Sequence, residues 1–152
     1  MKALLLITLL LAPLSVLADD LDTIIKHSGI EKVLNEANQN FIQDTYKIYP
    51  DLLMRSDTVD RFFSENVAIS NFKHELVSLL NENFNNAELK TISSALSDSE
   101  KETELFRFYG TELGQRWLSV SSQFSDIVLL GAVNKVMNPE SGLNSFLQQE
   151  SD

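Results

Sequence analysis

Residues able to support catalysis or metal binding are few in this chain, and they are not grouped. The only histidines are His27 and His74, and there is no cysteine. A zinc site recruits three or four His, Cys or carboxylate ligands at close spacing, and the His-Glu-x-x-His pattern fails at Ser78. We therefore expect no metal and no cofactor, with His27 a cation at a helix C-terminus and His74 a surface residue.

Covalent and acid-base catalysis have little support in the residue pattern. The chain has no Gly-x-Ser-x-Gly turn and no cysteine nucleophile. Its 22 acidic residues leave open a small hydrolase of cell-wall or glycan material, because that chemistry needs only two carboxylates beside the scissile bond. With so many acids some pair lies close by chance, so we assign no catalytic residue and expect no enzyme activity.

One grouping is a candidate binding site, formed by Tyr109, Gly114, Gln115, Arg116 and Trp117. On one continuous helix Tyr109 and Trp117 share a face, and Gly114 lets another backbone approach. The functional interpretation is an aromatic-walled groove for a peptide or an apolar ligand, with Arg116 at its rim. The structural interpretation, which we favour, makes both aromatic residues part of the core and Arg116 an ion-pair residue.

The first eighteen residues are typical of an export signal. Lys2 gives a basic start, residues 3–11 are almost entirely aliphatic, and residues 16–18 (Val-Leu-Ala) suit a signal peptidase. The aliphatic run is shorter than the roughly 20 residues of a membrane-spanning helix. We expect cleavage before Asp19 and no stable membrane anchor afterwards. The missing cysteines and Asn-x-Ser/Thr acceptors favour a bacterial periplasmic or secreted protein.

The charge balance restricts the partners. The chain has 12 Lys plus Arg against 22 Asp plus Glu, and removing the leader with its single Lys2 leaves 11 against 22, a net charge of −11. Nucleic acid and anionic lipid are poor partners for such a chain, because both are bound through clustered Lys and Arg. A protein or peptide remains as the class of partner, and the sequence indicates no oligomeric state.

Apolar residues recur at helical spacing through the rest of the chain, and strand signals are few. The spacing predicts helices over about 21–28, 30–49 and 57–80. Gly29 can close the first helix in the left-handed conformation, and Pro50 limits the second. Ser56 or Asp57 can cap the third, and a break near Asn66 stays open as an alternative.

Two further helices follow. Asn85 and Glu88 have the spacing of a capping box, and Phe84 can pack onto Leu89, so a short fourth helix starts there. A serine within residues 97–100 can cap a long helix from about residue 100 to Met137. Gly110, Gly114 and Gly131 would permit a bend or a close crossing in this helix, and Asn138-Pro139 ends it.

These elements predict an all-α fold, a four to six helix bundle packed around one long C-terminal helix. The predicted organisation is a cleaved signal peptide at 1–18, one helical domain at 19–138 and a polar C-terminal tail at 139–152. The tail contains few apolar residues, so we expect it to be loose or weakly docked.

Three motifs lie between residues 22 and 124: Ser28-Gly29 after a short helix, Phe-x-x-x-Glu-Leu at 84–89, and Phe-Tyr-x4-Gly-Gln at 108–115. Together they resemble a family of small exported bacterial all-helical domains whose function is not established. Residues 93–104 intervene between the second and third motifs like an insertion, and Gly110 to Leu113 stands where the family favours a proline. The resemblance implies a fold and a location, and no reaction.

The resulting hypothesis is a non-enzymatic periplasmic binding or accessory protein, which presents a helix-lined groove or surface to a protein or peptide partner. One alternative is the carboxylate-dependent hydrolase. The other is a carrier of an apolar small molecule, which requires an internal cavity lined by residues such as Phe106, Leu113, Trp117 and Phe124.

Overall fold

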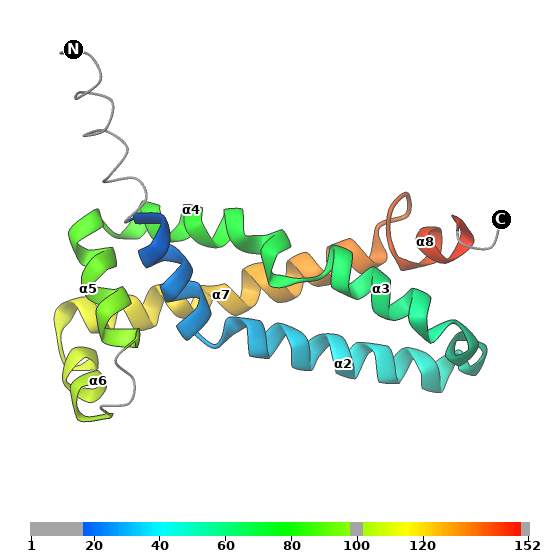
Figure 1. Ribbon diagram of the computed structural model, residues 1–152, viewed down its shortest axis with the longest axis horizontal. Helices are drawn as coiled ribbons and strands as arrows, with labels where there is room; N and C mark the ends of the chain where they lie inside the picture. Colours follow the sequence, from blue (N-terminus) through cyan, green and yellow to red (C-terminus); the bar gives the residue numbers. More distant parts are fainter. Residues whose placement is uncertain (1–16, 98–101, 150–152) are drawn as a thin grey trace, which may run out of the picture. The chain divides into compact units, whose positions relative to one another are not determined.

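The computed structural model describes residues 17–97 and 102–149, and every regular element within them is helical (Figure 1). The predicted all-α helical bundle is thus confirmed. The described chain divides into two compact units. Unit 1 comprises the described residues of 1–29 and 77–122, and unit 2 comprises those of 30–76 and 123–152. Most of the predicted leader and the serine cap at 97–100 lie outside the described residues, apart from Ser97.

The α-helices are α2 (Ile30–Ile48), α3 (Ser56–Asn66), α4 (Lys73–Asn83), α5 (Asn86–Ser97), α6 (Glu102–Tyr109), α7 (Glu112–Met137) and α8 (Leu143–Gln149), preceded by a helical segment at 17–27. Two 3-10 helices, η1 (Pro50–Arg55) and η2 (Ile69–Phe72), flank α3. The helices of the described residues outnumber the expected four to six, because two of the predicted helices are each divided and the C-terminal segment forms α8.

The first two predicted helices are confirmed. The segment at 17–27 ends at His27, and Gly29 follows with a φ of 77°, the left-handed conformation that closes a helix. Ser28 supports this turn, since its hydroxyl donates to the carbonyl of Ile25 over 2.6 Å. The next helix, α2, ends two residues before Pro50.

The predicted third helix is broken at Asn66, so the alternative with a break is the correct one. The side-chain nitrogen Nδ2 of Asn66 donates to the carbonyl of Phe62 over 3.1 Å, and Nδ2 of Asn71 donates to the carbonyl of Glu65 over 3.0 Å. The Glu65 carbonyl is one of the last four of α3, which lack helical partners, so the Asn71 side chain caps the end of this helix. The chain then passes through η2 into α4.

The cap predicted at Ser56 or Asp57 is wrong. The residue at the N-cap position of α3 is Arg55, and no side chain caps the helix there. The physical reason is η1, which runs directly into α3, so that the backbone of Ser56 is already helical.

The predicted capping box opens α5, in unit 1. The Asn85 side-chain oxygen accepts hydrogen bonds from the amides of Ala87 and Glu88 over 3.0 and 3.1 Å, and the Asn85 amide donates to the Glu88 carboxylate over 3.0 Å. These bonds satisfy amides that have no partner within the helix. Phe84 and Leu89, the predicted hydrophobic pair, are both buried.

The single helix predicted from residue 100 to Met137 is wrong. It is divided at Gly110 and Thr111 into α6 and α7. The Thr111 hydroxyl accepts a hydrogen bond from the backbone amide of Gly114 over 3.0 Å and donates one to the carbonyl of Phe108 over 2.7 Å. Thr111 therefore begins a new helix with its side chain while it closes the preceding one. The predicted end of α7 at Asn138-Pro139 is confirmed.

The C-terminal segment is folded, whereas we expected it to be loose or weakly docked. It forms α8 in unit 2, which buries Leu143 and Leu147. The ring centroids of Phe146 and Phe62 lie 5.4 Å apart, an edge-to-face contact with α3. The Arg55 guanidinium donates to the carbonyl of Leu147 in the last turn of α8.

Candidate functional site

The five residues of the predicted binding grouping all lie in unit 1 and make internal contacts. Trp117 is only 2% exposed, and Tyr109 is half-buried at the end of α6. The Gln115 side chain donates to the carbonyl of Tyr109. A Cβ on Gly114 would lie 2.7 Å from the carbonyl carbon of Phe108 and still closer to its oxygen, so the predicted close approach of a second backbone is real.

Arg116 joins three segments of unit 1. Its Nη1 lies 2.7 Å from Oε1 of Glu88 in α5, and its Nη2 donates to the carbonyl of Asn83 at the end of α4 over 2.7 Å. Its guanidinium carbon lies 5.2 Å from the centroid of the Phe84 ring. The hydrogen bond from Arg116, followed by the one from the Asn85 amide, lowers the pKa of Glu88.

These contacts agree with the structural interpretation of the grouping. The division at Thr111 places Tyr109 on α6, so it does not share a helix face with Trp117. Trp117 packs in the core instead of walling an open groove, and Arg116 is an ion-pair residue. Ligand binding by this grouping stays a prediction. Phe106, named for the cavity of an apolar carrier, is 75% exposed and lines no internal space.

Unit 2 contains a groove that the sequence did not lead us to predict, and we call it the α2–α7 groove. Its narrow part has a volume of about 100 Å³, and Ala37, Asn38 and Phe41 of α2, Phe63 of α3, and Leu129, Ala132, Val133 and Val136 of α7 line it. The ribbons of α2 and the C-terminal half of α7 run along each other here (Figure 1). Alanines on both helices leave room between them.

A wider part of about 460 Å³ adjoins the narrow part at Phe41 and Val136, which line both. Its other lining residues come from the end of α2, η1, the end of α7 and the start of α8: Thr45, Tyr49, Leu52, Met137, Asn138, Pro139, Leu143 and Asn144. The α2–α7 groove therefore extends past the last turn of both helices.

Apolar side chains stand exposed along both rims of this groove. On α7, Val133 is 54% and Met137 70% exposed, and they share a face with the exposed Leu130 because the three are spaced i, i+3 and i+7. On α2, Ile48 is 68% exposed and is seven residues from Phe41, which lines the groove. The apolar surface is thus continuous from the floor of the groove to its rims.

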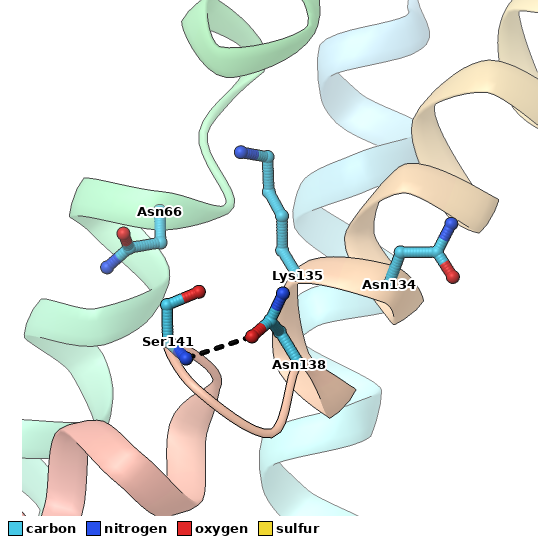
Figure 2. Close-up of a pocket in the computed structure, with 5 residues that line it drawn as sticks. All are labelled: Asn66, Asn134, Lys135, Asn138 and Ser141. Carbon is cyan, nitrogen blue, oxygen red and sulfur yellow. Dashed lines mark hydrogen bonds between the residues drawn. The ribbon is translucent and has the colours of Figure 1, made fainter.

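A polar pocket of about 260 Å³ in unit 2 meets the wide part of the groove at Asn138, which lines both, and its other lining residues are Asn66, Asn134, Lys135 and Ser141 (Figure 2). Most of its polar atoms serve local structure. The Asn138 oxygen accepts the amides of Glu140 and Ser141 over 2.9 Å each, and the Lys135 ammonium lies 5.7 Å from the Phe72 ring centroid. Lys135 and Asn134 extend in different directions in Figure 2, so these side chains form no convergent site.

Tyr46, also in unit 2, carries a buried hydroxyl that has no hydrogen-bond partner among the described residues. Burial raises the pKa of Tyr46, and the carboxylates of Asp60 and Asp57 raise it further. The hydroxyl is therefore held in its neutral form.

Neither histidine lines the α2–α7 groove or the polar pocket. His27 ends the first helical segment, and His74 is exposed in the first turn of α4. In the described ranges no group of three or more His, Cys, Asp or Glu side chains is placed to hold a metal ion. Within the same ranges, no helix combines the length and the apolar character needed to cross a membrane.

Searches of protein-family models, of curated proteins and of solved structures gave no match to this chain.

Proposed function

We propose that this chain is an exported, non-enzymatic binding or accessory protein, whose α2–α7 groove receives a segment of a partner protein or a peptide. The observation that carries the proposal is the continuous apolar surface formed by the groove floor and its exposed rims. Contiguous exposed apolar surface costs solubility, and on soluble proteins it is typical of interaction sites.

The dimensions of the groove suit a side chain of a partner in each of its parts. The narrow part is floored by Ala37 and Ala132, whose small side chains let an incoming residue approach the backbone of both helices. The wide part offers aromatic and aliphatic walls, Phe41, Tyr49 and Met137, together with the amides of Asn138 and Asn144. Apolar walls with a few polar groups are typical of ligand-binding clefts.

Export supports the same function. The basic start, the aliphatic run and the cleavage pattern of residues 1–18 favour a leader, and the resemblance to small exported bacterial helical domains favours the periplasm. The chain has no cysteine and hence no disulfide to stabilise it, and contiguous apolar surface that such a domain leaves exposed is typical of an interaction site.

The test of location is the mass of the chain recovered from the periplasm of an expressing bacterium. A chain that begins at Asp19 supports export and cleavage. Recovery of the uncleaved chain in the cytosol would contradict them.

The test of the groove uses the processed chain and peptides that present leucines at i, i+3, i+4 and i+7 on a helix. We expect micromolar binding, with chemical-shift changes at Ala37, Ala132 and Val133. Val133→Glu should weaken binding at least about tenfold, because a carboxylate would enter the apolar rim. Leu118→Glu is the matched control, since Leu118 is an exposed leucine of α7 that belongs to unit 1. Equal loss in both variants, or no binding, would contradict the proposal.

A further inference from the structure

The charged residues that flank the α2–α7 groove are mainly acidic. On α7, Asp126 lies four residues before Leu130 and seven before Val133, which places it on the same exposed stripe. On α2, Asp44 lies three residues after Phe41 and four before Ile48, again on the face that borders the groove. Each apolar rim therefore includes a carboxylate.

The wide part of the groove has two more acids at its edge. Asp51 precedes Leu52 and Glu140 follows Pro139, and both neighbours line the groove. Within residues 17–97 and 102–149, the carboxylates of Asp51, Glu140 and Asp126 form no ion pair. Asp44 pairs with Lys47 over 2.7 Å, but both side chains are about 70% exposed, and an exposed pair exchanges partners readily.

The basic residues near the groove have partners of their own. Lys47 pairs with Asp44, Arg55 donates to the carbonyl of Leu147, and the Lys135 ammonium faces the Phe72 ring. The edge of the groove is therefore negative, as is the whole chain with its net charge of −10. A partner with positive charges at matching positions would complement it.

The shape of the groove selects the conformation of the partner. Peptides that bind as strands add to the edge of a sheet, and the part of the chain that the structure describes has no strand. A groove between two helices instead receives the apolar stripe of a third helix, with anchors at i, i+3, i+4 and i+7. A second copy of this chain would bring acidic surfaces together, which opposes self-association.

From these observations we infer that the occupant of the α2–α7 groove is an amphipathic helix of another protein, with Lys or Arg flanking its apolar stripe. This inference rests on the proposed function and specifies the chemistry of the partner. The apolar stripe supplies the affinity, while the basic flanks pair with Asp44, Asp51, Asp126 and Glu140. Pairs of this kind are solvent-exposed, so their contribution depends strongly on salt.

The test compares two helical peptides with the same leucine stripe, one flanked by lysines and one by glutamates. Binding to the processed chain is measured by fluorescence anisotropy at low and high salt, about 20 and 500 mM NaCl. We expect the lysine peptide to bind at least about tenfold more tightly at low salt, and the difference to shrink at high salt. The Asp126→Asn, Glu140→Gln double variant should lose most of this preference.

Glu65→Gln is the control, because Glu65 is an exposed acid of unit 2 that lies on α3 and does not line the groove. It should leave the preference unchanged. If neither peptide binds, the proposed function itself fails. If both peptides bind equally at low salt, the result supports peptide binding in the groove and contradicts the inference that the partner helix is basic. Sedimentation that shows a dimer, dissociated by Val133→Glu, would identify a second copy as the occupant and also overturn the inference.

Discussion

The guanidinium of Arg116 lies 2.7 Å from the carboxylate of Glu88, and this ion pair ties α7 to the first turn of α5. The same Glu88 carboxylate closes the capping box by accepting the amide of Asn85. Arg116 in turn satisfies the carbonyl of Asn83, at the end of α4. One arginine therefore stabilises both the end of one helix and the start of the next, which are separated by only two residues.

We expect Arg116→Met to destabilise unit 1 by about 1 to 2 kcal/mol, because the Asn83 carbonyl loses its donor and the Phe84 ring loses its cationic neighbour. Arg116→Lys should recover only part of the lost stability, since an ammonium cannot reproduce the planar guanidinium that donates to two acceptors at once. Urea unfolding followed by Trp117 fluorescence measures the change, because the single tryptophan of the chain is buried in unit 1. Arg107→Met, an exposed change on α6, should have no effect.

The Glu88 interactions also predict a dependence on acid. Its pKa is lowered in the folded chain from the ordinary value of 4.5, so the unfolded chain binds a proton more readily. The contribution of Glu88 to stability is therefore present above pH 4.5 and is lost as the pH falls through the lowered pKa. Glu88→Gln should lose less stability than the unmodified chain between about pH 6 and pH 3. Parallel pH profiles would contradict this account.

Local signals in the sequence were sufficient to predict much of unit 1. The capping box at Asn85 and Glu88 depends on residues three apart, and the break at Gly29 depends on one backbone angle. The missed division at Thr111 is also local. A threonine followed by Glu112 is a common helix start. However, apolar residues continue at helical spacing from before Thr111 to after it, so their pattern gives no sign of a boundary.

The α2–α7 groove could not be predicted, because it depends on which apolar residues of α7 the core leaves exposed. The sequence does not show that Val128 is fully buried while Leu130, two residues later, is exposed to solvent. That division depends on tertiary packing between segments that are distant in the sequence, as the joint lining of the groove by α2, α3 and α7 illustrates. The position of Trp117 in the candidate grouping around Arg116 is likewise set by packing, since this aromatic residue is buried in unit 1.

Gly114 is placed where no side chain fits. A Cβ there would collide with the backbone of Phe108, which cannot move aside as a flexible side chain could. Gly114→Ala should therefore cost about 3 kcal/mol or more, or prevent unit 1 from folding. Gly110→Ala is the matched control, since its Cβ would meet no atom closer than 3.4 Å. We expect the free energy of unfolding of this variant to lie within about 0.5 kcal/mol of that of the unmodified chain, again measured by Trp117 fluorescence.

The unpartnered hydroxyl of Tyr46 predicts a stabilising substitution. Tyr46→Phe removes a buried hydroxyl that has no hydrogen-bond partner among the described residues, so we expect the free energy of unfolding to rise by up to about 1 kcal/mol. Because the pKa of Tyr46 is raised above 10.0, the neutral form is favoured by folding, and stability falls as the pH rises beyond that value. The variant should lose this alkaline sensitivity, whereas Tyr49→Phe, at an exposed position, should keep it. A destabilised Tyr46→Phe would show that the hydroxyl has a partner in solution.

The docking of α8 makes the C-terminal segment part of the core of unit 2. Leu147 is buried and its carbonyl accepts the Arg55 guanidinium, so Leu147→Ala should cost about 2 to 3 kcal/mol. Gln148→Ala, one residue away on the exposed side, should change stability by less than about 0.5 kcal/mol. Thermal unfolding followed by circular dichroism measures both. Leu143 of α8 also lines the wide part of the groove. Because Leu147→Ala loosens α8, it should also weaken the binding of the leucine peptides to the groove. Unchanged stability would mean that α8 is detached in solution, and the groove would then lose one of its walls.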